Sequence, residues 1–287
     1  MVALANGDGG RRVGLDPYAL FVVPLTALLL VLYAYPLVKV LWISVSDPAF
    51  GLGNYEKLFA VAGIQRMLWT TLKLCLITTS IAMVLGYVVA YALVHVGERQ
   101  RTAMWLFILI PFWVSVLART FSWLILLHDN GIVNGVLRTW GVTQEPIELV
   151  RNQFGVVVGM VHYMVPYALL PLYAAMRGID RRTIAAARGL GVGPLEAFLR
   201  VFLPLSLPGI VAAGVLVFIL TLGFFVTPAI LGGGKTLMIA EYVSVQILQT
   251  VRWGIGSMLA VVLLAWVFAS LGLVSRFVNL RLMFGAK

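Results

Sequence analysis

The sequence has few charged residues and one cysteine. Only 11% of its 287 residues are charged and 61% are hydrophobic, whereas a soluble domain has about 25% charged residues. So few ionisable side chains do not cover the surface of a soluble protein of this length. This excludes an ordinary soluble enzyme, a nucleic-acid-binding module and a disordered chain. The single Cys75 excludes an internal disulfide and a metal site built from several cysteines, and we expect it to be a small packing residue.

Acidic residues are scarcer than basic ones. The chain has 11 Asp and Glu against 21 Lys and Arg, which gives a net charge of +10. A basic balance can indicate nucleic acid, but the positions of these charges beside hydrophobic runs favour membrane topology and contact with anionic lipid. The histidines His95, His128 and His162 are too far apart in the sequence to indicate a metal site. We therefore predict the lipid bilayer, and not nucleic acid, as a partner, and no catalytic, metal or cofactor site in this chain.

Long hydrophobic runs are abundant. A membrane-spanning helix needs about 20 predominantly apolar residues, and six stretches meet this length. We therefore predict an all-α polytopic membrane protein with six transmembrane helices. They are residues 19–45, 67–96, 102–128, 153–176, 207–231 and 254–275. The first stretch is longer than the apolar region of a signal peptide and lacks an A-x-A-like cleavage site, so we expect a retained helix.

The distribution of Lys and Arg predicts the orientation. Twelve fall on one side of the six stretches and six on the other, with three inside them. Positive charge accumulates on the cytoplasmic side, so both termini are predicted to be cytoplasmic, as an N-terminal tail at 1–18 and a C-terminal tail at 277–287. The connection at 177–206 is predicted to be cytoplasmic too. The three loops on the other side have about 20 residues each and are expected to carry short helices.

The connection at 177–206 reads as two short helices joined by a glycine-rich turn. Asp180 suits a helix start because its carboxylate accepts from free backbone N–H groups. Three consecutive alanines then give the helix a face with little side-chain bulk, and glycines at 189, 191 and 193 interrupt it before Pro194. Such a projection suits docking into another protein. An amphipathic loop resting on lipid is the alternative.

This stretch carries a family resemblance. Its spacing A-A-A-x3-G-x9-V-x-L-P resembles the EAA signature of permease subunits of binding-protein-dependent ABC importers. The signature positions are Ala185, Ala186, Ala187, Gly191, Val201, Leu203 and Pro204. Other stretches resemble the spermidine/putrescine (PotB-like) branch. They are Leu85-Gly86-Tyr87, Ile110-Pro111-Phe112-Trp113, Gly159-Met160-Val161-His162-Tyr163 with Pro166, Pro171-Leu172-Tyr173, and Gly232-Gly233-Gly234-Lys235.

The resemblance runs from about Asn54 to the last span and implies a division of labour. It implies the type I ABC importer permease fold, with a core at 66–276 that includes 177–206 as the coupling loop. It also implies a second permease in a heterodimer, two ATPase subunits that bind ATP and Mg, and an extracytoplasmic solute-binding protein. The chain itself would be a non-catalytic, multi-pass protein of the bacterial inner membrane.

The resemblance also assigns residues to the contact with the ATPase. They are Ala185, Ala186, Ala187, Arg188, Gly191, Leu203 and Pro204. The family usually has Glu where this chain has Ala185, so a contact made by that Glu is in question here. Docking then relies on the small face and Gly191, with Arg181, Arg182 and Arg188 available for polar contacts.

Arg119 lies near the middle of the third stretch, between two tryptophans and without an acidic residue in the same stretch. Ionisable residues in membrane spans are costly and suggest function, so we expect Arg119 to face the bundle interior or the translocation path. The candidate path residues are Phe112, Trp113, Arg119, His162, Tyr163, Phe224, Phe225 and Thr227. Ordinary packing is the alternative for the aromatic residues, and a hydrogen bond between helices is the alternative for His162. Lys39 and Lys73 are expected to reach the membrane surface from near the ends of their spans.

The segment Gly232, Gly233, Gly234 and Lys235 precedes Thr236 and hints at a phosphate-binding loop. The full pattern needs a glycine five residues before Gly234, where this chain has Ala229, and the segment falls on the predicted outer side. We expect it to face the binding protein, with an inert turn as the alternative.

The solute is predicted to be a polyamine or a related amine or amino-acid-type compound, from the branch resemblance. The spans contain essentially no carboxylates, and Arg119 on the path would repel a polycation. Another solute, such as an opine or a phosphonate, is therefore kept as an alternative. A stand-alone secondary transporter is a further alternative, but it usually has an intramembrane Asp or Glu, and none is evident.

Overall fold

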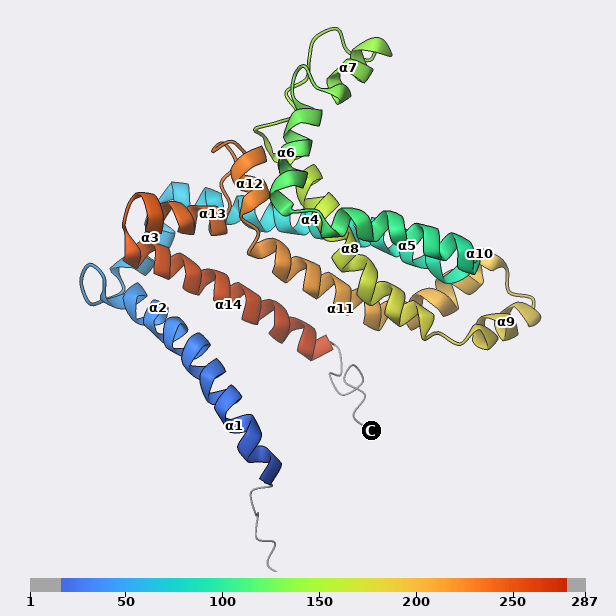
Figure 1. Cartoon of the computed structure of the whole chain (residues 1–287), viewed down its shortest axis with the longest axis horizontal. Helices are drawn as coiled ribbons and strands as arrows, with labels where there is room; N and C mark the ends of the chain where they lie inside the picture. The colour runs from blue at the N-terminus through green and yellow to red at the C-terminus, as the bar shows by residue number, and fades with distance from the viewer. Residues whose placement is uncertain (1–16, 278–287) are drawn as a thin grey trace, which may run out of the picture.

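The computed structural model describes residues 17–277 and is almost entirely helical (Figure 1). The predicted tails at 1–18 and 277–287 lie almost entirely outside the described residues. The α-helices are α1 (Pro17–Leu29), α2 (Tyr35–Ser46), α3 (Gly53–Ala60), α4 (Ala62–His95), α5 (Glu98–Trp113), α6 (Val116–Leu127), α7 (Ile132–Thr139), α8 (Gln153–Arg177), α9 (Arg181–Gly189), α10 (Pro194–Ala197), α11 (Leu203–Leu222), α12 (Val226–Leu231), α13 (Ile239–Ser244) and α14 (Trp253–Phe277). Three π-helical turns join or extend them: η1 (Leu30–Ala34), η2 (Phe198–Phe202) and η3 (Val245–Gln249).

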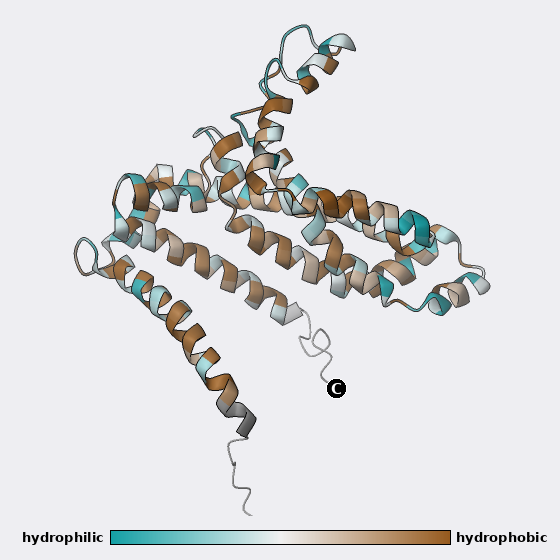
Figure 2. Ribbon diagram, in the orientation of Figure 1, coloured by the Kyte–Doolittle hydropathy of each residue, from teal (hydrophilic) through white to brown (hydrophobic). Residues whose placement is uncertain are grey.

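Five helical segments of the described chain are long and apolar enough to cross a membrane. They are Phe21–Ser46, Ala62–His95, Gln153–Arg177, Pro194–Leu222 and Trp253–Ser275. A sixth is counted if α5 and the following helices, which meet at a bend of 97°, form one broken span. Hydrophobic residues run along the length of these helices in Figure 2. The prediction of an all-α polytopic membrane protein is therefore confirmed.

The third predicted span, 102–128, is wrong as a single helix. α5 ends at Trp113 and α6 begins at Val116, and the two residues between them, Val114 and Ser115, have extended backbone with ψ of 137° and 139°. Pro111 in the last turn of α5 has no N–H to donate and favours a helix end. The chain therefore turns sharply where a continuous span was expected.

The fifth predicted span, 207–231, is also interrupted. Its helix begins earlier, at Pro194, and α11 ends at Leu222. Residues 223–225 separate α11 from the short helix α12. In a membrane, non-helical backbone is tolerated where protein or a water-filled cavity surrounds it. The residues at both interruptions are largely exposed in this chain, as Val114, Ser115 and Gly223 show.

Helices α4, α8 and α11 form the centre of the bundle and pack along one another (Figure 1). Small residues allow their close approach: a side chain on Gly86 would come within 2.9 Å of the Ala168 side chain, and one on Gly209 would collide with Ala175. Small residues at helix contacts are typical of membrane bundles because lipid provides no hydrophobic driving force between helices. The core is therefore built by shape rather than by polar pairing.

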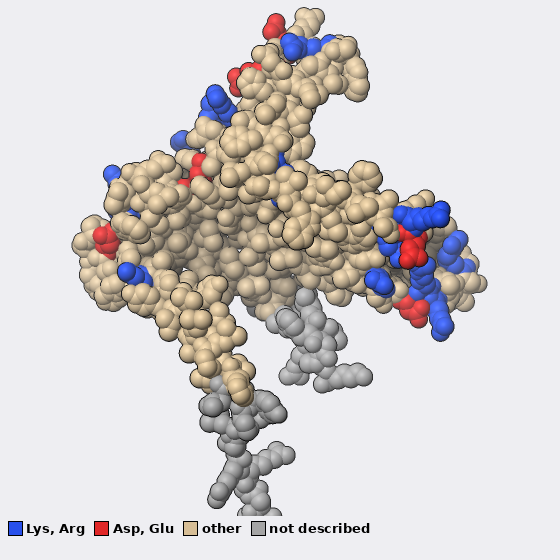
Figure 3. All heavy atoms as spheres, in the orientation of Figure 1, with Lys and Arg blue, Asp and Glu red and all other residues tan. Residues whose placement is uncertain are grey.

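The three loops opposite the 177–206 connection carry short helices, as predicted: α3, α7 and α13. The 177–206 connection lies at the other end of the molecule, where it forms α9 and α10. Figure 3 shows that Lys and Arg side chains gather at this end. The side of the membrane on which each end lies stays a prediction from the count of charges.

Candidate functional site

Helix α9 projects beyond the bundle at the end of the molecule (Figure 1). Its start is capped as predicted, because the Asp180 Oδ1 accepts a hydrogen bond of 2.8 Å from the backbone N–H of Arg182. Its end is followed by Gly191, whose φ of +87° is a left-handed conformation that glycine adopts at little cost. A capped, sharply terminated helix is a defined projection rather than a loose loop.

The surface of this projection is small and apolar. Ala185 and Ala186 are exposed and Ala187 is half-buried. Leu190 beyond them is 86% exposed, and Arg188 is exposed beside it. Exposed apolar patches rimmed by charge are typical of protein contacts.

The two remaining predicted coupling residues lie elsewhere. Leu203 and Pro204 begin α11, directly after the π-helical turn η2, and Leu203 is half-buried. They are therefore at the base of the projection and not on the face formed by the alanines. The predicted set therefore lies in two places, an exposed face of α9 and the start of α11.

The projection is tied to the end of α4, which the sequence alone did not indicate. The Arg181 Nη2 donates to the Val94 carbonyl oxygen at 2.7 Å. Arg101 donates to the carbonyl oxygens of Leu93 and Val96 at 3.1 and 3.2 Å. The last carbonyl groups of a helix have no hydrogen-bond partner within the helix. Here Arg181 and Arg101 donate hydrogen bonds to such carbonyl groups at the end of α4. Arg181, expected to be free for the ATPase, is instead held by its own chain.

An aromatic cluster lies beside this tie. The Tyr91 ring meets the Phe198 and Phe202 rings edge-on, with centroids 5.3 and 5.1 Å apart, and lies 4.2 Å from the His95 ring. Tyr91 and His95 come from α4, whereas both phenylalanines come from η2. The π-helical turn η2, which leads from the projection back to α11, thus packs on the same end of α4 that Arg181 binds. The four-residue spacings of Tyr91 and His95 in α4 and of Phe198 and Phe202 in η2 are the sequence signals for this cluster.

Arg119 lies in the first turn of α6, just after the break. The side chain is only 9% exposed, and its guanidinium carbon lies 4.4 Å above the centre of the Tyr163 ring. Its Nε and Nη1 are buried without a hydrogen-bond partner among the described residues. Arg119 is therefore buried against α8, and it forms no ion pair with a carboxylate among the described residues.

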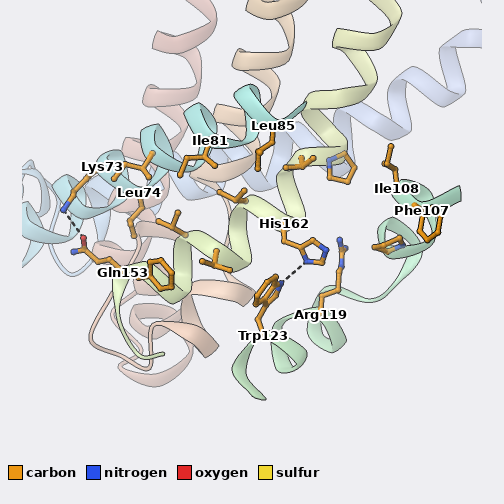
Figure 4. A pocket seen from close by; sticks show the side chains of 18 residues that line it. Lys73, Leu74, Ile81, Leu85, Phe107, Ile108, Arg119, Trp123, Gln153 and His162 are labelled. Carbon is orange, nitrogen blue, oxygen red and sulfur yellow. Dashed lines mark hydrogen bonds between the residues drawn. The ribbon is translucent and has the colours of Figure 1, made fainter. Parts of the chain in front are cut away.

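His162 is hydrogen-bonded between helices, the alternative that the sequence left open. The Trp123 Nε1 of α6 donates to the His162 Nδ1 of α8 at 3.0 Å (Figure 4). Because the indole N–H only donates, Nδ1 is the acceptor, and the neutral ring carries its hydrogen on Nε2. The pair fixes α6 on α8 next to Arg119.

The structure brings some of the predicted path residues together and separates others. Tyr163 contacts the Phe224 ring at 4.8 Å and the Tyr167 ring at 5.4 Å, and Tyr167 contacts Phe112 at 5.3 Å. Trp113 is 84% exposed and turned away from this cluster. Tyr167 lies four residues after Tyr163, and this helical spacing places both rings on the same face of α8.

The remaining two predicted path residues flank the second interruption. Thr227 in α12 is buried, and its hydroxyl lies 3.1 Å from the Thr120 hydroxyl of α6. Phe225 is 42% exposed, just before α12. The Thr120–Thr227 hydrogen bond joins the two helices that follow the two breaks, and Phe225 makes no ring contact with the aromatic cluster of Phe112, Tyr163, Tyr167 and Phe224.

A cavity of about 730 Å³ opens between α4, α5, α6 and α8 (Figure 4). Most of its lining is aliphatic or aromatic. The polar side chains that line it are Lys73, Arg119, Trp123, Gln153 and His162. The Lys73 Nζ donates to the Gln153 Oε1 at 3.0 Å. A volume of this size is that of a small-molecule site.

The glycine-rich segment at 232–235 forms a tight turn. Gly233 and Gly234 have φ of +54° and +74°, and Gly233 lies against the Arg151 side chain. Lys235 is exposed and lines a smaller cleft of about 370 Å³. The other lining residues are Leu124, His128, Asp129, Glu148, Val150 and Arg151. Within residues 17–277, no three His, Cys, Asp or Glu side chains converge as metal ligands.

Comparison with known proteins identifies the family. The model of the "binding-protein-dependent transport system inner membrane component" family matches residues 82–282. The chain belongs to this family. It is 32% identical over 208 residues to the spermidine/putrescine transport system permease protein PotB of Haemophilus influenzae, which covers 72% of each chain. It is 32% identical over 214 residues to PotB of Escherichia coli K12, covering 75% of this chain and 78% of that protein.

Solved importer structures share the fold of this permease. A bacterial ABC transporter involved in the import of the acidic polysaccharide alginate has a chain that matches with a TM-score of 0.69 at 18% identity, covering 90% of the permease and 94% of that chain. The same transporter in complex with an alginate pentasaccharide-bound periplasmic protein matches with a TM-score of 0.70 at 18% identity, covering 88% and 91%. The permease is thus a multi-pass inner-membrane transport component with the fold of ABC importer permeases.

Proposed function

We propose that this permease is the membrane subunit of an ATP-driven importer and that α9 docks it to the ATPase. The observation that carries the proposal is the exposed face of α9, where Ala185, Ala186 and Leu190 present a small apolar surface at the charged end of the bundle. ATP and Mg are bound by two separate ATPase subunits. This chain contributes no catalytic residue to hydrolysis.

The remaining partners complete the importer. A second permease pairs with this one as a heterodimer, and a solute-binding protein delivers the solute from outside. The alginate importer solved in complex with its periplasmic protein supports a solute-binding protein as a partner. The turn at 232–235 and the neighbouring cleft offer the solute-binding protein a polar surface. This surface carries negative charge from Asp129 and Glu148 and positive charge from Arg151.

The solute is a small organic compound of the polyamine, amine or amino-acid class. The relatives named for spermidine and putrescine support this class. The buried Arg119 favours a second candidate within the same importer class, a solute with an anionic group such as an opine or a phosphonate. A stand-alone secondary transporter has less support, because no carboxylate lines the large cavity.

Site-directed cross-linking tests the docking proposal. The natural Cys75 is buried, so an Ala186→Cys variant carries one accessible thiol on α9. We expect a short bifunctional reagent to join this thiol to the ATPase in membranes that contain the whole transporter. Ile132→Cys is the matched control, because Ile132 is 67% exposed on α7 at the opposite end. An Ala186→Cys thiol that reacts with maleimide but never yields an ATPase adduct would refute the proposal.

A further inference from the structure

Arg119 carries a buried charge that the described residues do not compensate. Two of its three guanidinium nitrogens are buried without a partner, and the cavity that Arg119 lines contains no Asp or Glu. A buried charge left without an opposite charge is strongly destabilising. The structure therefore holds a charged group at a cost in stability, which suggests that an anion pairs with this group during transport.

The contact with Tyr163 leaves the binding edge of Arg119 unused. The guanidinium carbon lies 4.4 Å above the centre of the Tyr163 ring, which is a cation–π contact. The N–H groups of a guanidinium point outward in its plane and form a fork that matches two carboxylate oxygens. Tyr163 thus contacts the group while its Nε and Nη1 keep no hydrogen-bond partner among the described residues.

The helix that carries Arg119 adds positive potential at the same place. α6 starts at Val116, after the break, and its first N–H groups have no partner within the helix. The side chain of Ser115 makes no capping hydrogen bond to them. The N-terminus of a helix carries a partial positive charge, so the backbone and the Arg119 side chain favour an anion together.

The other polar groups of the cavity are mostly hydrogen-bond donors. The His162 ring presents its Nε2–H because Trp123 donates to Nδ1. The Lys73 ammonium is already bound to the Gln153 Oε1, the one amide oxygen in the lining. A polyamine offers only donors and positive charge, whereas a carboxylate offers only acceptors and negative charge. The cavity matches the carboxylate.

We infer that the solute moved by this permease carries a carboxylate, which Arg119 binds in the cavity between α4, α5, α6 and α8. The inference rests on the proposed importer function and narrows its solute class to amino-acid-type compounds, amines that carry a carboxylate. The side chains of Ile81, Leu85 and Ile108 in the same lining offer an apolar wall for the rest of the solute.

Two pairs of probes that differ only by a carboxylate test this inference. Ornithine is putrescine with one added carboxylate, and lysine is cadaverine with one. The transporter is purified in detergent through a tag on this chain, with its accompanying subunits and without binding protein, and the thermal unfolding midpoint is measured with each probe. A ligand that binds the folded state raises this midpoint.

We expect ornithine and lysine, but not putrescine and cadaverine, to raise the midpoint of the wild type. In Arg119→Met the shift disappears, and the ligand-free midpoint equals or exceeds that of the wild type because the uncompensated charge is gone. Arg138→Met is the matched control, since Arg138 is exposed on α7, and it keeps the shift. If Arg119→Met does not fold, Arg119→Lys keeps the charge without the fork and should bind ornithine about 10-fold or more weakly.

Four results would overturn the inference. They are a diamine shift as large as that of its amino acid, a carboxylate shift that persists in Arg119→Met, no shift with any probe, and loss of the second permease from purified Arg119→Met. The last result would mean that the fork pairs with a carboxylate of that subunit. An ATPase that co-purifies while diamines bind equally well would refute this inference and leave the importer proposal standing.

Discussion

Arg119 and Glu241 are both buried charged residues, but their surroundings give them different roles. Arg119 lines a large cavity, and its Nε and Nη1 have no hydrogen-bond partner among the described residues. Glu241 lies in the short helix α13, outside the membrane-spanning segments, is 7% exposed and has an Oε2 atom without a hydrogen-bond partner. Burial raises the pKa of Glu241 above its ordinary value, and a hydrogen bond from the Met238 backbone opposes this rise only in part. Glu241 is therefore a site where pH acts on stability.

Replacing Glu241 by Gln should stabilise the protein in a pH-dependent way. The folded state holds the Glu241 proton more tightly than the unfolded chain, in which the pKa is about 4.3. Wild-type stability therefore falls as pH rises from about 4.3 through the raised pKa of the folded state. We expect Glu241→Gln to match the wild type at low pH and to exceed it by roughly 1–3 kcal/mol above that window, the usual cost of an unsatisfied buried group.

The measurement is the thermal unfolding midpoint of the purified transporter across this pH range. Glu145→Gln, at an exposed position in the loop after α7, is the control and should leave the pH profile unchanged. A constant difference between Glu241→Gln and the wild type at every pH would contradict this account of Glu241.

At the residue scale, the sequence predicted that Arg119 has no acidic residue near it in its own stretch. It did not predict which side chains surround Arg119. The absence of an acidic residue in its stretch was visible, and so was its distance from the ends. Its position over Tyr163 depends on the break after Trp113, which re-aims α6 toward α8. Trp113, the last residue of α5 before the break, is exposed, whereas its neighbour Phe112 joins the aromatic cluster.

At the scale of elements, hydropathy located the helices but not their interruptions. A window of apolar residues reads the same whether the chain continues straight or turns, so 102–128 and 207–231 looked like single spans. Pro111 signals the first break, but Pro24, Pro166 and Pro171 lie within helices that continue. Only the packing of α6 and α12 against each other, through Thr120 and Thr227, distinguishes a break from a tolerated proline.

The tie between α9 and α4 predicts an effect on coupling. Arg181→Met removes the hydrogen bond to the Val94 carbonyl, so movement of α9 is transmitted to α4 less directly. We expect solute uptake per ATP hydrolysed to fall several-fold while the ATPase still co-purifies. Both quantities are measured in vesicles with the reconstituted transporter.

Arg182→Met is the control for this tie. Arg182 is the next residue on the same helix and is exposed, and its bond to Asp180 is made by the backbone N–H. It should keep normal coupling. Equal losses in the two variants would mean that positive charge on α9, and not the bond to α4, matters for transport.

At the scale of the whole molecule, the charged projection formed by α9 and the cavity lined by Arg119 lie in different parts of one bundle. α4 and α8 connect them: the ends of both helices flank the projection, and their middle turns line the cavity. The sequence showed the projection because small residues and glycines form a local pattern. It did not show the cavity, because the lining residues come from four helices whose contacts are not local.

The most direct test of the central claim, that α9 couples this permease to an ATPase, is solute-stimulated ATP hydrolysis in reconstituted vesicles. The binding protein is supplied with ornithine or spermidine, and the wild type is compared with Ala186→Glu, Gly191→Trp and the mild control Ala186→Ser. The account predicts that the solute no longer stimulates hydrolysis in the first two variants, because a charge or a bulky ring spoils the small face, and that Ala186→Ser keeps the stimulation. Wild-type stimulation in both Ala186→Glu and Gly191→Trp would contradict it.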